Sequence, residues 1–211
     1  FSILEEGFPA RFKICKKVPV EVDLTSEQEA LWREHKKKMD LYRDYQRKVD
    51  GESLGIEDFD TPDVSLLDLK VELAERILTS CHFCEHRCEV DRSGGETGYC
   101  GVGERARVSS KFVHRGEEAE LVPSYTIFFS GCTLCCQYCQ NWDISQYPES
   151  GTVTSPEELA ASIQDIKREG VRNVNWVGGD PTPNLHVILA SLNECEVNIP
   201  SVWNSNMYLT E

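Results

Sequence analysis

Two segments before residue 80 carry apolar residues at every third or fourth position, the spacing that places side chains on one face of a helix. In the first segment these positions are Trp32, His35, Met39, Tyr42 and Val49. Ser26 followed by Glu29 matches a capping box, so this helix is expected to begin at Thr25 or Ser26 and to end at Asp50. In the second segment the apolar positions are Leu66, Leu69, Leu73 and Ile77. This helix is expected to begin after a capping Ser65 and to reach Leu78.

The second half of the chain alternates short apolar runs with helical segments. Strands are expected at 126–129, 174–177 and 200–203, and helices at 155–170 and 184–193. Ser155-Pro156-Glu157-Glu158 is a typical helix start, with a cap, a proline and acidic residues in the first turn. This alternation is typical of parallel β/α units. Two further strands are predicted upstream, at 106–114 and 120–122, around a turn at Gly116.

These patterns divide the chain into three regions. Residues 1–60 form a helical N-terminal region and a linker, and the Gly- and Pro-containing segment 51–63 covers the linker. Residues 61–123 combine a helix with a cysteine-rich region that is expected to bind metal, and residues 124–211 hold the β/α units.

Composition and charge exclude several classes of protein. Of the 211 residues, 40% are hydrophobic and 27% are charged, which is a globular composition. A net charge of −14 argues against a general binder of nucleic acid or of anionic membranes. The chain has no apolar run of the length that a spanning helix requires and no secretory signal, so we expect a cytoplasmic protein. Eight of the ten cysteines lie between Cys81 and Cys139, a clustering that favours metal binding over disulfides.

The last four clustered cysteines follow the strand expected at 126–129. Cys132, Cys136 and Cys139 give the spacing C-x3-C-x2-C, which suits an iron–sulfur cluster held by thiolates. Three ligands on a four-iron cluster leave one iron open for catalysis. Spacing alone also allows Cys132, Cys135 and Cys139, as C-x2-C-x3-C, and a zinc knuckle or plain buried thiols are further alternatives.

The first four clustered cysteines form a second candidate metal site with the spacing C-x2-C-x3-C-x11-C. They are Cys81, Cys84, Cys88 and Cys100. Four thiols are the ligand set of a structural zinc or of an auxiliary iron–sulfur cluster, and free thiols are a third alternative. His82 and His86 lie in the same segment and are expected to be bystanders rather than ligands.

The chain resembles the radical S-adenosylmethionine (SAM) superfamily around the C-x3-C-x2-C segment. Gly131 before the first cysteine, Tyr138 before the last and Asn141 after it carry the likeness. In that superfamily the motif follows the first barrel strand, so the resemblance favours Cys132, Cys136 and Cys139 as ligands and leaves Cys135 as a neighbour.

A second motif of the chain, Gly178-Gly179-Asp180-Pro181, follows the next strand and resembles the Gly-Gly-Glu-Pro motif of the superfamily, which holds the amino group of SAM. The resemblance therefore implies that Tyr138 and these four residues contact the cofactor. Asp180 stands where the superfamily usually has Glu, which leaves contact through its shorter side chain less certain than contact through the backbone.

The resemblance also implies an α/β fold and an activity. The fold would be a partial (β/α)6-type barrel with about three β/α units, preceded by the helical and cysteine-rich regions; because such barrels usually have six units, we expect the chain to be a truncated piece. Segments 128–132, 139–145 and 177–183 are similar to proteins like the pyruvate formate-lyase activating enzyme. Such an oxidoreductase cleaves SAM reductively at a 4Fe–4S cluster, and the resulting 5′-deoxyadenosyl radical abstracts hydrogen.

The resemblance implies two protein partners. One is an electron donor such as ferredoxin or flavodoxin, and the other is a glycyl radical enzyme that would be activated. Neither nucleic acid nor a membrane is expected as a partner. The alternatives are a radical enzyme that acts on a small molecule or on another protein, and a zinc-binding interaction module without catalysis.

Overall fold

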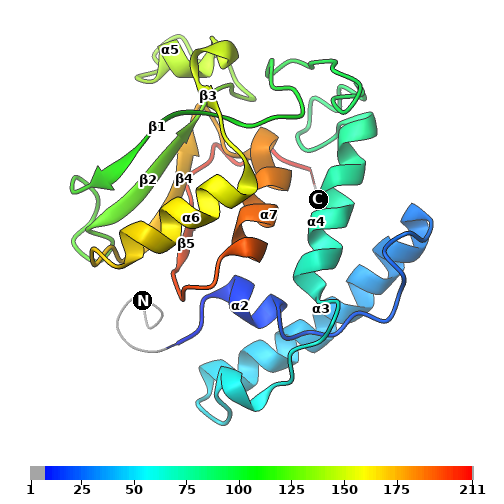
Figure 1. Ribbon diagram of the computed structural model, residues 1–211. Helices are drawn as coiled ribbons and strands as arrows, with labels where there is room; N and C mark the ends of the chain where they lie inside the picture. Colours follow the sequence, from blue (N-terminus) through cyan, green and yellow to red (C-terminus); the bar gives the residue numbers. More distant parts are fainter. Residues whose placement is uncertain (1–7, 211) are drawn as a thin grey trace.

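The computed structural model describes residues 8–210, which form a mixed α/β fold around one five-stranded sheet (Figure 1). The helices are α2 (Arg11–Cys15), α3 (Gln28–Asp50), α4 (Leu66–Ile77), α5 (Trp142–Ser145), α6 (Pro156–Lys167) and α7 (Leu185–Glu194). The strands are β1 (Arg107–His114), β2 (Ser124–Phe129), β3 (Thr152–Val153), β4 (Asn173–Gly178) and β5 (Ser201–Trp203). Short 3-10 turns occupy Ile56–Asp58, Leu78–Ser80, Pro148–Ser150 and Thr182–Asn184.

The sheet combines the predicted parallel strands with an antiparallel addition. Its order is β3-β1-β2-β4-β5. β2, β4 and β5 are parallel, with Phe129 opposite Gly178 and Trp176 opposite Trp203. β1 is antiparallel to both β2 and β3. The predicted strand–helix–strand–helix–strand order is therefore confirmed, whereas the closure of this sheet into a partial barrel stays a prediction.

Helices α6 and α7 lie against one face of the sheet and bury their apolar stripes there (Figure 1). Ile163 of α6 and Ile188 of α7 are in the same core cluster as Ile127 and Trp176 of the sheet. α6 begins as predicted, because the Ser155 hydroxyl accepts a hydrogen bond from the backbone of Glu158 while the Glu158 carboxylate accepts one from Ser155. This cap fixes where the helix starts and thus how it lies on the sheet.

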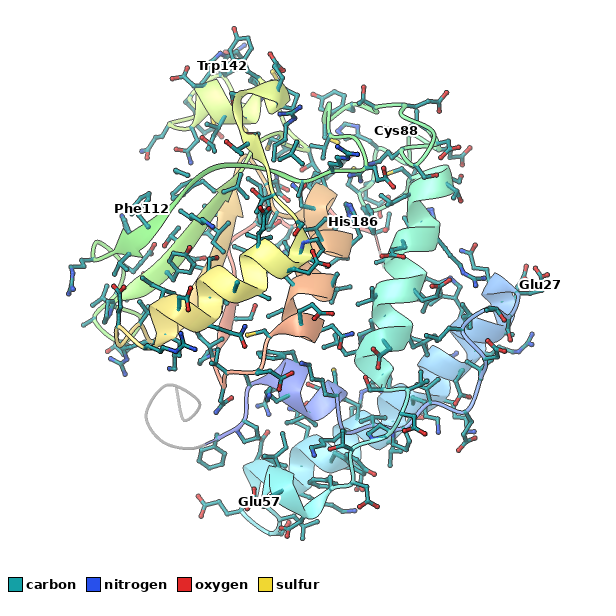
Figure 2. The ribbon with its side chains drawn as sticks, in the orientation of Figure 1. Glu27, Glu57, Cys88, Phe112, Trp142 and His186 are labelled. Atoms are coloured by element: carbon teal, nitrogen blue, oxygen red, sulfur yellow. The ribbon has the colours of Figure 1, made fainter. Side chains whose placement is uncertain are left out.

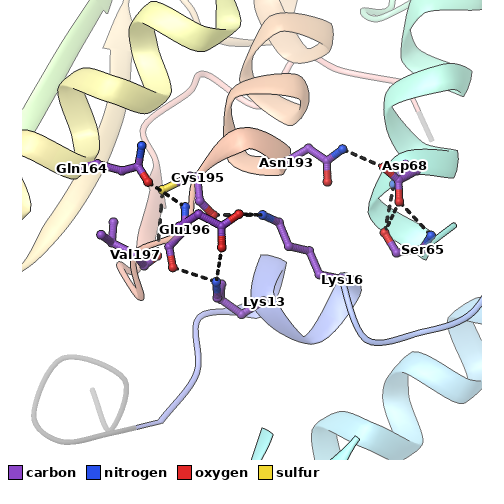
Figure 3. Close-up of polar contacts among 9 residues, drawn as sticks. All are labelled: Lys13, Lys16, Ser65, Asp68, Gln164, Asn193, Cys195, Glu196 and Val197. Atoms are coloured by element: carbon purple, nitrogen blue, oxygen red, sulfur yellow. Dashed lines mark hydrogen bonds and ion pairs between the residues drawn. The ribbon is translucent and has the colours of Figure 1, made fainter. Parts of the chain in front are cut away.

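The N-terminal helices pack on the outer side of α7 rather than standing apart. α4 lies beside α7, and Asn193 at the end of α7 donates a 2.8 Å hydrogen bond to Asp68 of α4 (Figure 3). The ammonium of Lys13 donates to the carbonyl of Glu196 at 2.8 Å, and that of Lys16 donates to the carbonyl of Cys195 at 2.9 Å. These contacts join α4 to the end of α7, and α2 with the residue after it to the loop that leads into β5.

The sequence-based prediction for the first helix is partly wrong. α3 begins at Gln28, and Glu27 precedes it without a side-chain cap, so Ser26 and Glu29 form no capping box. Asp23 instead accepts hydrogen bonds from the backbone and the hydroxyl of Thr25, which closes a local turn before the helix. The helix is anchored by Leu31, which is fully buried.

Two further findings concern strands and membranes. The strand predicted at 120–122 is absent, because Leu121 and Val122 both donate to the carbonyl of Glu118 and make a turn instead. Within residues 8–210, none of the helices is both long and apolar enough to span a bilayer.

Candidate functional site

The carboxyl ends of the three parallel strands meet at one edge of the sheet, where ligands commonly bind in α/β folds. β2 leads into the cysteine loop 130–141, β4 into the Gly-Gly-Asp-Pro loop 178–184, and β5 into segment 204–210. The backbone of Gly179 donates to the carbonyl of Phe129 at 2.9 Å, and that of Asp180 donates to Gly131 at 3.0 Å. The first two loops are therefore joined directly.

The paired glycines make this junction sterically feasible. Gly178 has φ +129°, and a Cβ there would overlap the backbone of Phe129. A Cβ on Gly179 would overlap the carbonyl of Gly131. Only glycine accommodates both the positive φ and the close approach at 178. The structure thus gives both glycines a packing role, and their contact with SAM stays a prediction.

The thiols of the cysteine loop differ in exposure. Cys135 is exposed, whereas Cys132, Cys136 and Cys139 are half-buried. The sulfur of Cys132 accepts hydrogen bonds from the backbone of Leu134 at 3.4 Å and from Asn206 Nδ2 at 3.8 Å. The sulfur of Cys139 lies 3.5 Å from the hydroxyl of Ser145.

Cys136, Cys139 and Asp180 lie close enough to Cys132 to change the pKa of its thiol. The pKa of Cys132 is raised to about 11, mainly by burial, and the charges of Asp180, Cys139 and Cys136 act in the same direction. A free thiol at this position is therefore protonated at neutral pH. A metal ion would have to displace that proton in order to bind the thiolate.

Both carboxylate oxygens of Asp180 accept hydrogen bonds from other residues of this chain. Its side chain is fully buried, and its Oδ1 accepts from the backbone of Thr182 at 2.8 Å. Its Oδ2 accepts from the hydroxyl of Ser205 and from the backbone of Asn206, each at 2.9 Å. The carboxylate therefore ties the loop after β4 to the segment after β5. Two other residues that were predicted to contact SAM differ in exposure: Pro181 is buried, and Tyr138 is 89% exposed.

The cysteine-rich segment 81–103 packs against the same edge. His86 Nε2 donates to the carbonyl of Thr133 at 2.8 Å, so this predicted bystander holds the two cysteine loops together. Figure 2 shows Cys88 of this segment and Trp142, which follows the other cysteine loop, at the same end of the molecule. The charge of Asp180 acts on the thiols of both Cys84 and Cys132.

The four thiols of segment 81–103 lie close enough to influence one another. Burial raises the pKa of Cys84, and the charges of Cys88 and Cys81 raise it further. Burial also raises the pKa of Cys100, on which Cys81 and Cys84 act in the same direction. The Cys88 sulfur accepts a hydrogen bond from the backbone of Tyr99 at 3.4 Å, and the Cys81 sulfur accepts one from Arg92 at 3.7 Å.

Arg92 is a site residue that sequence reasoning missed. It is 1% exposed, and its guanidinium donates to the carbonyls of Gly103 and Pro183 as well as to Cys81. In the part of the chain that the structure describes, no carboxylate forms an ion pair with it. An arginine between two turns gives no sequence signal, because its burial depends on contacts with residues as distant as Pro183.

The thiols of the two predicted sites are not gathered as a set of metal ligands in the described part of the chain. All ten cysteines are free. Among the described residues, no three His, Cys, Asp or Glu side chains are gathered into a group that could hold a metal ion. Both sets of predicted ligands therefore stay predictions. Asn184, in the loop after β4, is fully buried, and neither of its side-chain amide atoms has a hydrogen-bond partner among residues 8–210.

The chain is similar to a known family and to a protein of another organism. Residues 126–211 match the family model of the radical SAM superfamily. An uncharacterized protein of Methanocaldococcus jannaschii is 47% identical over 215 residues, which cover 99% of this chain and 61% of that protein. The chain thus spans less than two thirds of that relative's length. No solved structure matches the chain. The matched residues thus include the cysteine loop and the Gly-Gly-Asp-Pro loop.

Proposed function

We propose that the chain is the cluster-binding part of a radical SAM enzyme and that Cys132, Cys136 and Cys139 hold its 4Fe–4S cluster. The observation that carries the proposal is the position of these cysteines, inside the matched domain and on the loop that follows the first parallel strand. When bound and reduced, such a cluster supplies the electron that cleaves SAM into methionine and a 5′-deoxyadenosyl radical.

The residues at this edge fit a cluster in their chemistry. Three half-buried thiols are available within eight residues of one loop, and the exposed Cys135 is left outside the set. Hydrogen-bond donors already face the Cys132 sulfur, as is usual around iron–sulfur thiolates. The role of the protein is to hold these thiols in place, to limit the access of water and to orient SAM.

The contacts of Asp180 change how SAM would be held. Because both carboxylate oxygens accept hydrogen bonds from this chain, we infer that Asp180 shapes the loop rather than binding the SAM ammonium directly. The backbone carbonyls of the Gly-Gly-Asp-Pro loop would then accept from the ammonium. The presence of Asp in place of the usual Glu is consistent with this role, because the Asp180 carboxylate already makes hydrogen bonds with Ser205 and Asn206.

For the substrate, we propose the glycine of a partner enzyme, as in activating enzymes similar to that of pyruvate formate-lyase. The support is the likeness of segments 128–132, 139–145 and 177–183. A ferredoxin or flavodoxin would be the electron donor. A small-molecule substrate is the alternative. A glycine-centred radical on the partner after incubation with SAM supports the activase, whereas deuterium transfer into a metabolite supports the alternative.

Anaerobic reconstitution with iron and sulfide tests the cluster ligands. The triple variant Cys132→Ala, Cys136→Ala, Cys139→Ala is expected to lose one 4Fe–4S cluster per chain and all cleavage of SAM. The matched control, Cys135→Ala, removes a thiol from the same loop and is expected to retain both. Cleavage of SAM by the triple variant would disprove the ligand assignment, and a wild-type chain that contains zinc but takes up no iron would support the interaction module instead.

We further propose that Cys81, Cys84, Cys88 and Cys100 bind a second metal centre. The support is Arg92, since a buried guanidinium without a carboxylate partner is costly unless a nearby group carries negative charge. Thiolates on a metal would supply that charge beside it. A structural zinc and an auxiliary cluster both meet this requirement.

Metal analysis of the triple variant, in which only the second site remains, distinguishes the two centres. Iron with sulfide indicates an auxiliary cluster, and stoichiometric zinc indicates a structural site. Adding Cys84→Ala and Cys88→Ala to the triple variant should remove that metal, whereas adding Cys15→Ala, a buried cysteine outside both sets, should leave it in place. Metal retained after the loss of Cys84 and Cys88 would contradict the second site.

A further inference from the structure

Asn206 lies beside the first cysteine of the C-x3-C-x2-C segment, although 74 positions of sequence separate the two residues. Its Nδ2 is 3.8 Å from the sulfur of Cys132, within the range of an N–H···S hydrogen bond. Only one other donor, the backbone N–H of Leu134 at 3.4 Å, reaches this sulfur among the described residues. Asn206 is therefore the one side chain in that part of the protein that donates to Cys132.

The orientation of the Asn206 amide is fixed by its other contacts. The backbone N–H of Tyr208 donates to Asn206 Oδ1 at 2.8 Å, and a backbone N–H requires an oxygen as its partner. Nδ2 is therefore the other amide atom, which reaches the sulfur of Cys132 and, at 2.9 Å, Thr133 Oγ1; that hydroxyl also lies 3.2 Å from Oδ1. Thr133 is fully buried and Asn206 is exposed, so this anchor lies at the boundary of the protein interior.

Asp180 holds the backbone of Asn206 in this place. The carboxylate accepts from the backbone of Asn206 and, through the same oxygen, from the hydroxyl of Ser205. Its other oxygen is fixed by the backbone of Thr182. A fully buried carboxylate with three donors has little freedom to move. A continuous path of hydrogen bonds thus runs from the loop after β4 to the Cys132 sulfur.

We propose that Asn206 is a positioning residue that makes the cluster easier to reduce, by donating an N–H···S hydrogen bond to Cys132 from a backbone held by Asp180. This inference rests on the proposed function. A reduced cluster carries one more negative charge than an oxidised one, and its thiolate sulfurs share that charge. A donor on a thiolate sulfur therefore stabilises the reduced form more and raises the reduction potential.

The test compares reduction potentials of the reconstituted full chain, measured by an electron paramagnetic resonance titration without SAM. The triple background Cys81→Ala, Cys84→Ala, Cys88→Ala removes any signal from the second site. Asn206→Ala loses the donor. Asn206→Asp keeps the acceptor for Tyr208 but loses the donor and adds negative charge. The matched control, Asn204→Ala, alters an exposed asparagine that bonds Trp176 through its backbone.

At a fixed solution potential, the ratio of reduced to oxidised cluster is expected to fall roughly threefold to tenfold in Asn206→Ala, the equivalent of one lost hydrogen bond. The fall should be larger in Asn206→Asp, and Asn204→Ala should match the parent. A parent-like potential in Asn206→Asp at full cluster content would overturn the inference, even where Asn206→Ala fails to fold. A parent chain that takes up no iron would instead overturn the proposed function.

Discussion

At the residue scale, Gly178 is the position where the fold and the candidate site depend most on a single atom. Its φ of +129° lies in a region that essentially only glycine occupies, and a Cβ would overlap the backbone of Phe129 on β2. Backbone overlap cannot be relieved by a side-chain rotation, so either β4 or the cysteine loop would have to shift.

We therefore expect Gly178→Ala to lower the free energy of unfolding by at least about 3 kcal/mol, from backbone strain together with overpacking. Gly170 is the matched control, because it has φ +87° but open space around its Cα. Gly170→Ala should cost only about 1 kcal/mol, from backbone strain alone. Urea unfolding of the two variants measures the difference. Equal losses of unfolding free energy in the two variants would show that backbone strain, and not contact with Phe129, is the reason that position 178 requires glycine.

At the element scale, helix α3 is held to α4 partly by an uncharged histidine. His35 Nε2 accepts from the ammonium of Lys70 on α4 at 2.7 Å, and the His35 ring makes an edge contact with Trp32. Burial, together with the charge of Lys70, lowers the pKa of His35 to about 4. The folded protein thus keeps this ring neutral at a pH at which the unfolded chain protonates it.

The pH dependence follows from the direction of this pKa shift. A depressed pKa in the folded state contributes stability above about pH 6.5, which is lost as the pH falls towards 4. The ring is only partly buried, so we expect a loss of about 1 kcal/mol rather than the full value of the shift. His35→Gln should not show this loss. Denaturant unfolding of both proteins at pH 7 and pH 4.5 gives the difference, and a difference that does not change with pH would contradict the role of His35.

The elements were predictable where local signals agree with one another. α6 has a cap, a proline and acidic residues at its start, and β2, β4 and β5 are apolar runs bounded by turns. The start of α3 was predicted two or three residues too early, because the turn closed by Asp23 competes with the capping box. β3 has only two residues and depends on pairing with β1, so no local pattern indicates it.

The candidate site was predictable in its motifs but not in its contacts. Spacing left two registers for the cysteines, and family resemblance was needed to favour Cys136 over Cys135. Asp180 was expected to face SAM, yet its hydrogen bonds go to residues such as Ser205, 25 positions away. Contacts of this range depend on the register of β4 against β5, which no local pattern contains.

At the scale of the whole molecule, a single apolar core spans the three regions that the sequence suggests. Phe12, Leu31 and Leu69 from the N-terminal helices belong to the same cluster as Ile127 and Trp176 of the sheet. Hydrogen bonds from Lys13 and Lys16 to the loop after α7 reinforce this junction (Figure 3). Regions that share one buried core are expected to unfold together.

Hydrogen exchange in increasing urea, followed by mass spectrometry, tests this cooperativity. Peptides from α3 and from β2 should reach the same free energy of opening as urea rises, because exposing Leu31 also opens the core around Ile127. The variant Lys16→Met, which removes one bond across the junction, should lower both values by a similar amount of about 1 kcal/mol. If α3 opened at a much lower free energy than β2 in both proteins, residues 8–60 would be a separate folding unit, and the continuity of the core would not control stability.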